Sequence, residues 1–477
     1  MQELKYDLLI KQGHVVDPVN MVDQVMDVGI KDGKIAAVAS DLELSDAENT
    51  LWSEGLLVMP GIVDSHAHVA RPKAFGAGYR MLVKAGVTTA VDFEGPMEVV
   101  IDEIMTYGCG LNVAVLEGLW PGVGLSSEHA SRQEAMEQVQ RALDKGSLGV
   151  KLLGGHYPLT PETIANVIEA AAESGAYVAF HVGSTKTGSN ILGLEEAIQL
   201  ASGHPLHIAH VNSYCRGLID EPLVEIGRAL SILKQAQNLV SESHLAPLNG
   251  CSGRIGENGL PASHVTRNCL KALGYPINEA GLRQALLDGR AAVYSLVGRT
   301  MQHIWKEEAY RCWLAEDTQV GVSFPANLRS AALICATEKH DSGEFVVDAI
   351  SSDGGAIPRN VILSHGLALV QFGALTLSEL VLKLAYNPAC MFGFTNKGHL
   401  TIGADADVIV VHPCTGRVHA TVIAGQFSAL EGIPLTRPGH ILTTERGVKV
   451  LRQSKVNYRV VNLRDSTFFN RGARAVD

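Results

Sequence analysis

Two histidines, His66 and His68, stand two residues apart at the end of the apolar run GIVDSHAH. Side chains at positions i and i+2 of a β-strand point to the same face, where two imidazoles can bind one metal ion. The spacing alone is weak support, because 18 histidines in 477 residues produce about 0.7 such pairs by chance. The setting is more informative, since a Pro-Gly turn leads into the strand and the histidines come at its C-terminal end.

Seven further apolar runs also end at or near a polar side chain. Together with His66, these side chains are Asp92, Glu117, Lys151, His181, His210, Glu242 and Asp353. The first six gaps between them span 25 to 34 positions, the length of one strand and one crossover helix. Eight such units predict a closed (β/α)8 barrel, in which the strand ends bring these side chains together.

The last gap, from Glu242 to Asp353, is 111 residues long. It predicts an insertion at about 245–345, which begins with the Gly- and Pro-containing segment APLNGCSGRIGENGLP. We expect this insertion to pass as a loop over the barrel mouth and to contact the substrate.

The flanking segments predict the rest of the architecture. Amphipathic stretches such as SRQEAMEQVQRALDKG and TPETIANVIEAAAESG supply helices between the strands. Residues 1–58 contain short β-rich runs. A similar pattern of short β-rich runs is found at 399–455, in GHLTIGADADVIVVHP, RVHATVIAGQF and ERGVKVLR. We therefore expect an α/β protein with a TIM-like barrel at 59–398 and a small β-sandwich domain formed from both chain ends. Residues 456–477 form a tail to which the sequence assigns no role.

Composition argues against several classes of partner. The net charge of −11 and pI near 5.9 disfavour nucleic acid, whose binding needs clustered Lys and Arg. No segment reaches the roughly 18 apolar residues of a membrane span, and the chain does not begin with a signal-peptide pattern, so we expect a cytoplasmic protein. The eight cysteines include no CxxC pair and are expected to be reduced, packed thiols.

The segment VMPGIVDSHAHV resembles the first barrel strand of the amidohydrolase superfamily, in its cyclic amidohydrolase branch. The stretch from ALTLSELVLKLAYNPAC to GADADVIVV resembles the superfamily's final helices and return into the β domain, so the resemblance covers about residues 5–425. It implies two divalent metal ions, expected to be zinc, held by His66, His68, Lys151, His181, His210 and Asp353. It also implies that Lys151 is an N6-carboxylysine whose carbamate bridges the ions, a modification that requires the neutral amine.

The same resemblance implies the reaction. It is hydrolysis of an amide C–N bond, in a cyclic amide such as a hydantoin or dihydropyrimidine, with a small molecule as the partner. Two ions about 3.5 to 4 Å apart would share a hydroxide and polarise the substrate carbonyl. Asp353 would take the hydroxide proton and pass it to the leaving nitrogen. Homodimers or homotetramers are expected from the resemblance alone.

The sequence departs from its relatives where they bind substrate. Dihydroorotases carry an arginine two positions after the second metal histidine, but here that position is Ala70 and the arginine is Arg71, which on a continuing strand would face the other side. Hydantoinases place an oxyanion-binding tyrosine five residues beyond the lysine, where this chain has His156, with Tyr157 next. Either residue could donate to the oxyanion or be an ordinary loop residue. Arg71, Asn212 and Arg254 are further candidates for binding or orienting substrate.

Three other readings stay open. An N-acyl-D-amino acid deacylase or an isoaspartyl-dipeptidase-like hydrolase is the main alternative for the substrate. Deaminases of the superfamily generally use one metal and no carboxylated lysine, which Lys151 disfavours. A non-catalytic, dihydropyrimidinase-like assembly protein usually lacks several ligands, whereas all six positions are filled here. The ligand set also accepts Mn, Co or Ni in place of zinc.

Overall fold

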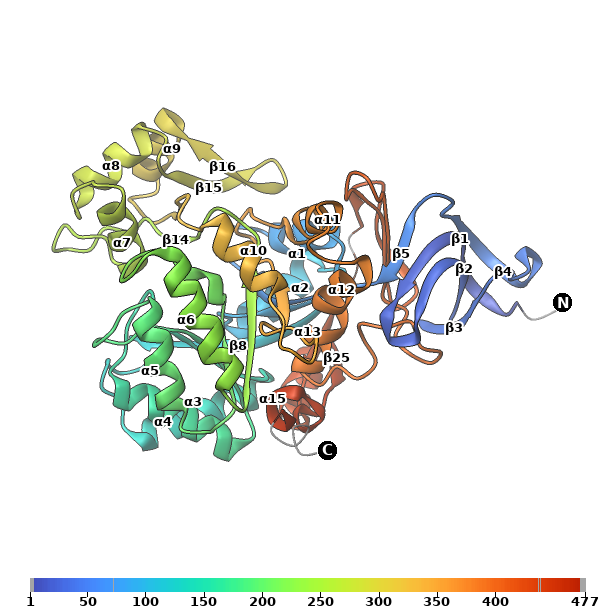
Figure 1. The fold of residues 1–477 in the computed structure, drawn as a ribbon, viewed down its shortest axis with the longest axis horizontal. Helices are drawn as coiled ribbons and strands as arrows, with labels where there is room; N and C mark the ends of the chain where they lie inside the picture. Colours follow the sequence, from blue (N-terminus) through green and yellow to red (C-terminus); the bar gives the residue numbers. More distant parts are fainter. Residues whose placement is uncertain (1–3, 72, 436, 438, 472–477) are drawn as a thin grey trace.

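The computed structural model describes residues 4–71, 73–435, 437 and 439–471. Figure 1 shows a central barrel between two smaller bodies. The N-terminal strands, in blue, form a β domain on one side, and a yellow group of helices and strands lies at the opposite end.

Eight parallel strands form the barrel. They are β6 (Ile62–His68), β7 (Val87–Asp92), β8 (Asn112–Pro121), β10 (Gly149–Leu153), β11 (Tyr177–His181), β12 (Leu206–Ile208), β13 (Leu239–His244) and a divided eighth strand, β18 (Ala349–Ser351) and β19 (Gly354–Gly355). Because β18 pairs with β13 and β19 pairs with β6, the ring of strands closes. The predicted fold class and all eight predicted strands are confirmed.

A helix follows each barrel strand. These are α1 (Ala77–Lys84), α2 (Met97–Tyr107), α3 (Arg132–Lys145), α4 (Pro161–Ser174), α5 (Ile191–Ala201), α6 (Pro222–Gln235), α10 (Arg329–Thr337) and α11 (Ile362–Gln371). Local sequence sets their ends, as α4 illustrates. The side chain of Thr160 accepts a hydrogen bond from the backbone N–H of Thr163, and Gly175 ends the helix in a left-handed conformation. Such caps explain why these helices were predictable.

The β domain is a nine-stranded sheet built from both ends of the chain. Its N-terminal strands are β1 (Tyr6–Asp17), β2 (Val22–Lys31), β3 (Lys34–Ala39), β4 (Ala47–Trp52) and β5 (Leu57–Pro60), and its C-terminal strands are β20 (Val408–Val411), β21 (Val418–Ile423), β22 (Gln426–Leu430) and β23 (Ile433–Pro434). The two groups join where β20 pairs antiparallel with β5. After α11, the short helices α12 (Leu377–Val381), η4 (Leu382–Tyr386) and α13 (Asn387–Met391) lead the chain into this sheet.

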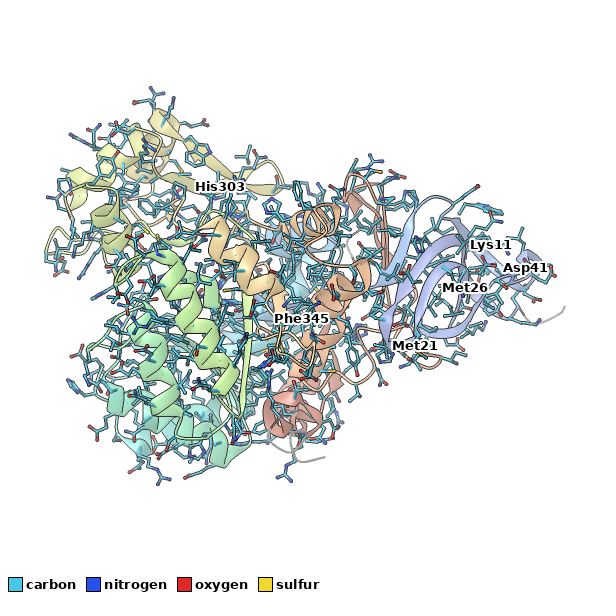
Figure 2. The ribbon with its side chains drawn as sticks, viewed as in Figure 1. Lys11, Met21, Met26, Asp41, His303 and Phe345 are labelled. Atoms are coloured by element: carbon cyan, nitrogen blue, oxygen red, sulfur yellow. The ribbon has the colours of Figure 1, made fainter. Side chains whose placement is uncertain are left out.

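Residues 245–328, which we call the insertion, form a folded unit and not the predicted loop. It contains the strands β14 (Cys251–Ser252), β15 (Ala292–Val297), β16 (Thr300–Trp305) and β17 (Gly321–Ser323), and the helices α7 (His264–Ala272), α8 (Glu279–Leu287) and α9 (Lys306–Ala315). Its strands make a separate antiparallel sheet, and Leu270, Trp313 and Phe324 are fully buried in a core of its own. Figure 2 labels His303 on β16 of this unit. The predicted range also ran too far, because α10 packs on α6 as a barrel helix.

The C-terminal segment returns from the β domain to the barrel. There β24 (His440–Thr443) pairs with the start of β8 and with β25 (Asn457–Val460). The stretch ERGVKVLR was wrongly predicted as β-like, since it forms η5 (Glu445–Gly447) and α14 (Val448–Ser454). Its alternating valines suit a strand, but it is helical and buries Leu451 fully, so tertiary packing overrides the local preference.

The described part of the tail packs against the N-terminal end of a barrel strand. In α15 (Thr467–Asn470), the Phe468 ring stacks on Tyr177 of β11 with centroids 4.0 Å apart. Five of the eight cysteines are buried, as predicted for mostly packed thiols: Cys109, Cys215, Cys251, Cys269 and Cys335. Within the described ranges, no helix is long and apolar enough to cross a membrane.

Candidate metal centre and pocket

A pocket of about 660 Å³ lies at the C-terminal ends of the barrel strands. All six predicted metal ligands line it: His66, His68, Lys151, His181, His210 and Asp353. Four of the five predicted substrate contacts line it as well: Arg71, His156, Tyr157 and Arg254. The barrel therefore gathers side chains that are up to 287 residues apart in the sequence.

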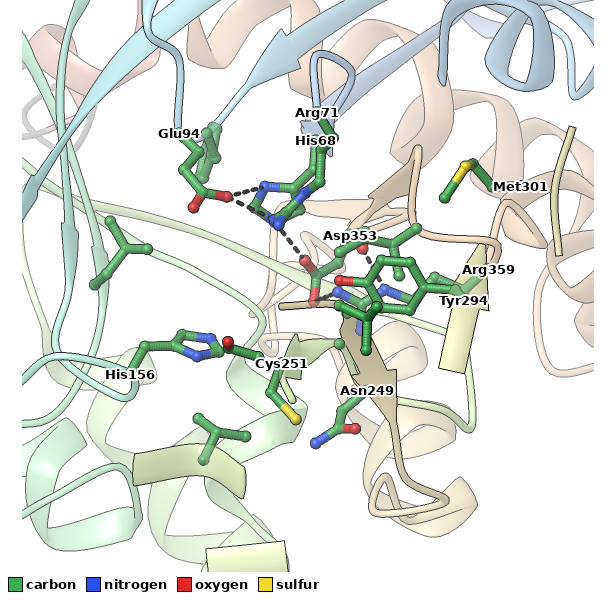
Figure 3. A pocket seen from close by; sticks show the side chains of 18 of the residues that line it. His68, Arg71, Glu94, His156, Asn249, Cys251, Tyr294, Met301, Asp353 and Arg359 are labelled. Atoms are coloured by element: carbon green, nitrogen blue, oxygen red, sulfur yellow. Dashed lines mark hydrogen bonds and ion pairs between the residues drawn. The ribbon is translucent and has the colours of Figure 1, made fainter. Parts of the chain in front are cut away.

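The first strand and the eighth strand meet at a tight group of three side chains. The ligand atoms of His66, His68 and Asp353 all lie within 4.8 Å of one another. Asp353 Oδ1 is 3.4 Å from His66 Nε2 and 3.2 Å from His68 Nε2, the latter contact being visible in Figure 3. Asp353 has a left-handed backbone with a φ of 48°, a conformation that aspartate tolerates, and it interrupts the strand between β18 and β19.

The other three predicted ligands lie beside this group. The ring of His210 is 5.3 Å from that of His66 and 4.3 Å from that of His181, measured between centroids. The Lys151 ammonium nitrogen lies 4.4 Å from the centroid of the Phe93 ring. Lys151 Nζ is buried and has no hydrogen-bond partner among the described residues, nor has Nδ1 of His210.

This donor set fits divalent cations. Burial holds the pKa of His66, His181 and His210 well below the usual range, so their imidazoles are neutral and have a free lone pair. Burial also lowers the pKa of Lys151, although the nearby carboxylates oppose the shift. A neutral amine without a partner suits carboxylation, which would convert it into an anionic ligand.

Glu242, at the end of β13, fixes two of the histidines. One carboxylate oxygen accepts hydrogen bonds from His66 Nδ1 and from the backbone N–H of His210, each at 2.7 Å. The other oxygen accepts from the Ser351 hydroxyl at 2.5 Å. With its Nδ1–H donated to Glu242, His66 directs the lone pair of Nε2 toward Asp353. Glu242 appears among the strand-end residues of the sequence, but its spacing does not reveal this supporting role.

Glu94, two residues beyond β7, joins Arg71 to the histidine pair. Its Oε2 lies 2.6 Å from Arg71 Nη2 and 3.3 Å from His68 Nδ1 (Figure 3). Burial opposes ionisation, but Arg71 and His68 lower the pKa of Glu94 below its usual range. Arg71 lines the pocket, as a predicted substrate contact should, because β6 ends at His68 and strand alternation does not extend to the loop.

Arg359 is a second partner of Asp353 that sequence reasoning missed. Its Nη2 lies 2.7 Å from Asp353 Oδ2, and its Nε donates to the Asp353 carbonyl (Figure 3). Burial raises the pKa of Asp353, but Arg359 and His66 outweigh it and hold that pKa well below the usual range. Asp353 is therefore an ionised carboxylate with one oxygen toward the histidines and the other toward Arg359. No motif in the sequence marks Arg359.

Of the other predicted substrate contacts, His156 and Tyr157 line the pocket, whereas Asn212 lies outside its lining. His156 lies 5.0 Å from His181 between ring centroids, and its Nδ1 is 3.1 Å from Ser263 Oγ. Burial lowers the pKa of His156 to about 4 and raises that of Tyr157. Asn212 is fully buried outside the pocket lining, where its Oδ1 accepts a hydrogen bond from the backbone N–H of His244.

The insertion supplies the wall of the pocket opposite the barrel. Asn249, Cys251, Arg254, Tyr294 and Met301 all line the cavity, and Figure 3 labels Asn249, Cys251, Tyr294 and Met301 in the same view as Asp353. Cys251 and Tyr294 are buried, whereas Arg254 is exposed. The expectation that this segment faces the pocket agrees with its position here, although the sequence named only Arg254.

Comparison with known proteins agrees with this geometry. The model of the amidohydrolase family matches residues 57–215. A dihydroorotase of Streptococcus pneumoniae serotype 4 is 26% identical over 414 residues, covering 84% of this chain and 89% of the relative. An allantoinase of Escherichia coli O1:K1 is 22% identical over 452 residues, covering 86% of this chain and 87% of the relative.

A solved structure shares the fold. The N-acyl-D-glutamate deacylase of Bordetella bronchiseptica, complexed with zinc and a phosphonate inhibitor, superimposes with a TM-score of 0.67 and 17% identity. The match covers 92% of this chain and 99% of that structure. At this identity the likeness establishes the barrel and β domain alone.

Proposed function

Because this chain is a member of the amidohydrolase superfamily, we propose that it hydrolyses the C–N bond of a cyclic amide with two divalent metal ions. It is a hydrolase of carbon–nitrogen bonds other than peptide bonds. The single observation that carries the two-metal proposal is the buried Lys151 Nζ, which has no hydrogen-bond partner in the described part of the chain. It shares one pocket with the other proposed ligands, His66, His68, His181, His210 and Asp353. A lysine kept only for structure would be expected to bond a carbonyl or a carboxylate there.

The proposed ligands fall into two groups around the lysine. His66, His68 and Asp353 would hold one ion, and His181 and His210 would hold the other, with carboxylated Lys151 between them. Zinc is the proposed metal, supported by the zinc in the Bordetella deacylase. When bound, the ions supply Lewis acidity and a water that ionises near neutral pH.

The chain's own groups would then move the proton and place the substrate. Asp353 Oδ1, which faces His66 and His68, takes the proton of the attacking water and passes it to the leaving nitrogen. Arg359 keeps the carboxylate ionised and in position through Oδ2. His156 or Tyr157 would donate to the oxygen that becomes negative as the carbonyl is attacked.

A cyclic substrate is favoured over an acyclic one by the relatives. The dihydroorotase and the allantoinase align over most of this chain, whereas the N-acyl-D-amino acid deacylase alternative rests on a shared fold at 17% identity. A non-catalytic assembly role is disfavoured because every proposed ligand position is filled. We also propose a homodimer or homotetramer, which light scattering would test.

Metal content and turnover together test the proposal. We would measure metal per chain and hydrolysis of hydantoins, dihydropyrimidines and N-acyl amino acids for the wild type and for Lys151→Ala. We expect about two ions per wild-type chain and a sharp fall of both metal and turnover in the variant. An intact mass that includes a carbamate would support the modified lysine.

The matched control is Lys383→Met. Lys383 is also fully buried and lies over an aromatic ring, that of Phe345, but its Nζ donates to the Val347 carbonyl at 2.6 Å and does not line the pocket. The control should keep its metal. Wild-type protein that holds no metal after incubation with zinc and bicarbonate would contradict the proposal.

A further inference from the structure

The charges that line the pocket are nearly all paired. Its three carboxylates each have a cationic partner: Glu94 with Arg71, Asp353 with Arg359, and Glu316 with Lys73. Two arginines of the lining are left, Arg216 and Arg254. Neither forms an ion pair with any carboxylate of the described residues, so the pocket has an excess of positive charge before a ligand enters.

The two arginines differ in their surroundings. Arg254 is exposed on the insertion, where water solvates its charge. Arg216 is partly buried in the loop after η3 (Val211–Tyr214), and its Nε is buried without a hydrogen-bond partner. One nitrogen, Nη2, donates to Asn327 Oδ1 at 2.6 Å, the single side-chain bond that the described residues offer it. A guanidinium has five N–H donors, so with Nε buried and one Nη2 donor bonded to Asn327, three terminal N–H groups are left for a ligand.

An unpaired cation in this position is costly for the fold. Burial lowers the pKa of Arg216, with the charge of Arg359 adding to the effect, yet an arginine stays protonated at any physiological pH. A buried charge is ordinarily balanced by a partner of opposite sign. Asn327 holds the guanidinium in place through its amide oxygen without neutralising it, and its own Nδ2 donates to the Ala246 carbonyl. Among the described residues, no carboxylate supplies the balancing charge.

We propose that Arg216 binds a carboxylate of the substrate, so that this chain selects acidic amides over neutral ones. The inference rests on the proposed function and narrows its substrate class. A planar guanidinium binds a carboxylate through two parallel hydrogen bonds, which fixes orientation as well as charge. Arg216 follows the sixth strand closely and shares the pocket with His210, so a carboxylate held there would lie near the reacting carbonyl. The charge of Arg71 is already balanced by Glu94, which favours Arg216 as the anchor of a carboxylate.

A matched pair of probes tests the proposal. Hydantoin-5-acetic acid and hydantoin-5-acetamide have the same ring and nearly the same shape but differ in charge. We expect the wild type to prefer the acid by at least about 30-fold in kcat/KM. Arg216→Met should abolish the preference by raising KM for the acid far more than KM for the acetamide. Arg216→Lys should keep part of the preference for the acid, because lysine has the positive charge but lacks the two parallel N–H donors of a guanidinium.

A matched control and a binding measurement keep the two proposals separable. Arg228→Met removes a surface arginine that pairs with Glu195 and Asp220, and it should leave the preference intact. Calorimetry measures the binding of both probes without turnover. Tighter binding of the acid by the wild type, lost in Arg216→Met, would support the inference even if neither probe is hydrolysed. Absence of hydrolysis would count against the cyclic-amide function alone. Equal binding of acid and acetamide by the wild type, or an equal loss for both in Arg216→Met, would overturn it.

Discussion

The two walls of the pocket are built in different ways. On the barrel wall, the proposed metal ligands lie at the ends of strands that are each paired on both sides. On the insertion wall, the lining residues belong to a separate four-stranded sheet with its own core. The barrel wall therefore carries the reaction chemistry on a rigid frame, whereas the opposite wall can vary without moving a ligand.

The supporting contacts differ in the same way. Around the ligands, the barrel strands and loops are tied together by the hydrogen bonds of Glu242 and by the ion pairs of Glu94 and Arg359. Behind the insertion wall, support comes from apolar packing around Trp313, whose indole N–H donates to the Gly253 carbonyl at 2.8 Å. Substitutions in the contacts around the metal ligands should impair metal binding and turnover. Substitutions in the apolar core around Trp313 should impair substrate binding.

The largest effect is expected on the barrel wall at Asp353. Asp353→Asn cannot accept the water proton, so kcat should fall by about 10³- to 10⁴-fold. Steady-state kinetics and metal analysis on the same preparation check this. Asp348→Asn is the control, because that residue pairs with Arg471 and does not line the pocket. Full turnover of Asp353→Asn with both metals bound would refute its role as proton carrier.

The next largest effect is expected in the core of the insertion. Trp313→Ala removes a fully buried side chain, which costs about 3–5 kcal/mol. Because the insertion has its own core, hydrogen exchange should accelerate in peptides from 251–324 and not in barrel strands, while metal content is kept and KM rises. Equal loss of protection in both regions would mean that the two walls are one cooperative unit.

A smaller effect is expected behind the metal ligands. Glu242→Gln keeps the shape but replaces one of the two carboxyl oxygens that hold His66, the His210 N–H and Ser351 with an amide NH2, so metal affinity should fall roughly 10- to 100-fold. Competition with a chelator measures this. Glu103→Gln is the matched control, since Glu103 is also buried but lies on α2 outside the pocket lining. Unchanged affinity in Glu242→Gln would show that the barrel wall does not depend on this network.

The smallest effect concerns the stability of the insertion in acid. Burial lowers the pKa of His303 to about 4, and its Nε2 lies 3.0 Å from Ser323 Oγ. Between pH 6.5 and 4 the unfolded insertion binds a proton that the folded form does not, so stability falls as the pH falls through this window. The loss is at most about 2 kcal/mol because the ring is partly exposed.

Hydrogen exchange of insertion peptides at pH 7 and pH 5 measures that loss. His303→Gln should flatten the pH dependence within the insertion and leave the barrel peptides unchanged. An identical pH profile in the wild type and the variant would exclude His303 as the source.

The strands and the order of the proposed ligands could be predicted from sequence because their signals are local and repeated. Each strand is an apolar run of a few residues, and the spacing of 25 to 34 positions recurs six times. In a closed parallel barrel, such a series leaves one arrangement in which the strand ends converge. The strand-end positions of His66, Lys151 and His181 follow from it without knowledge of any contact. Asp353 comes after the 111-residue gap, and the ligand role of all four was implied by the resemblance to the amidohydrolase superfamily.

Only the tertiary structure decided which residues support and surround those ligands. The bond between His66 and Glu242 joins residues 176 positions apart, and that between Arg216 and Asn327 joins residues 111 apart. Arg71 reaches the pocket because its strand stops early, whereas Asn212 is drawn into a buried backbone contact. Periodicity in the sequence shows which face of a helix or strand a side chain occupies. A contact between residues far apart in the sequence produces no such pattern. The supporting contacts and the fold of the insertion are therefore visible only in the tertiary structure.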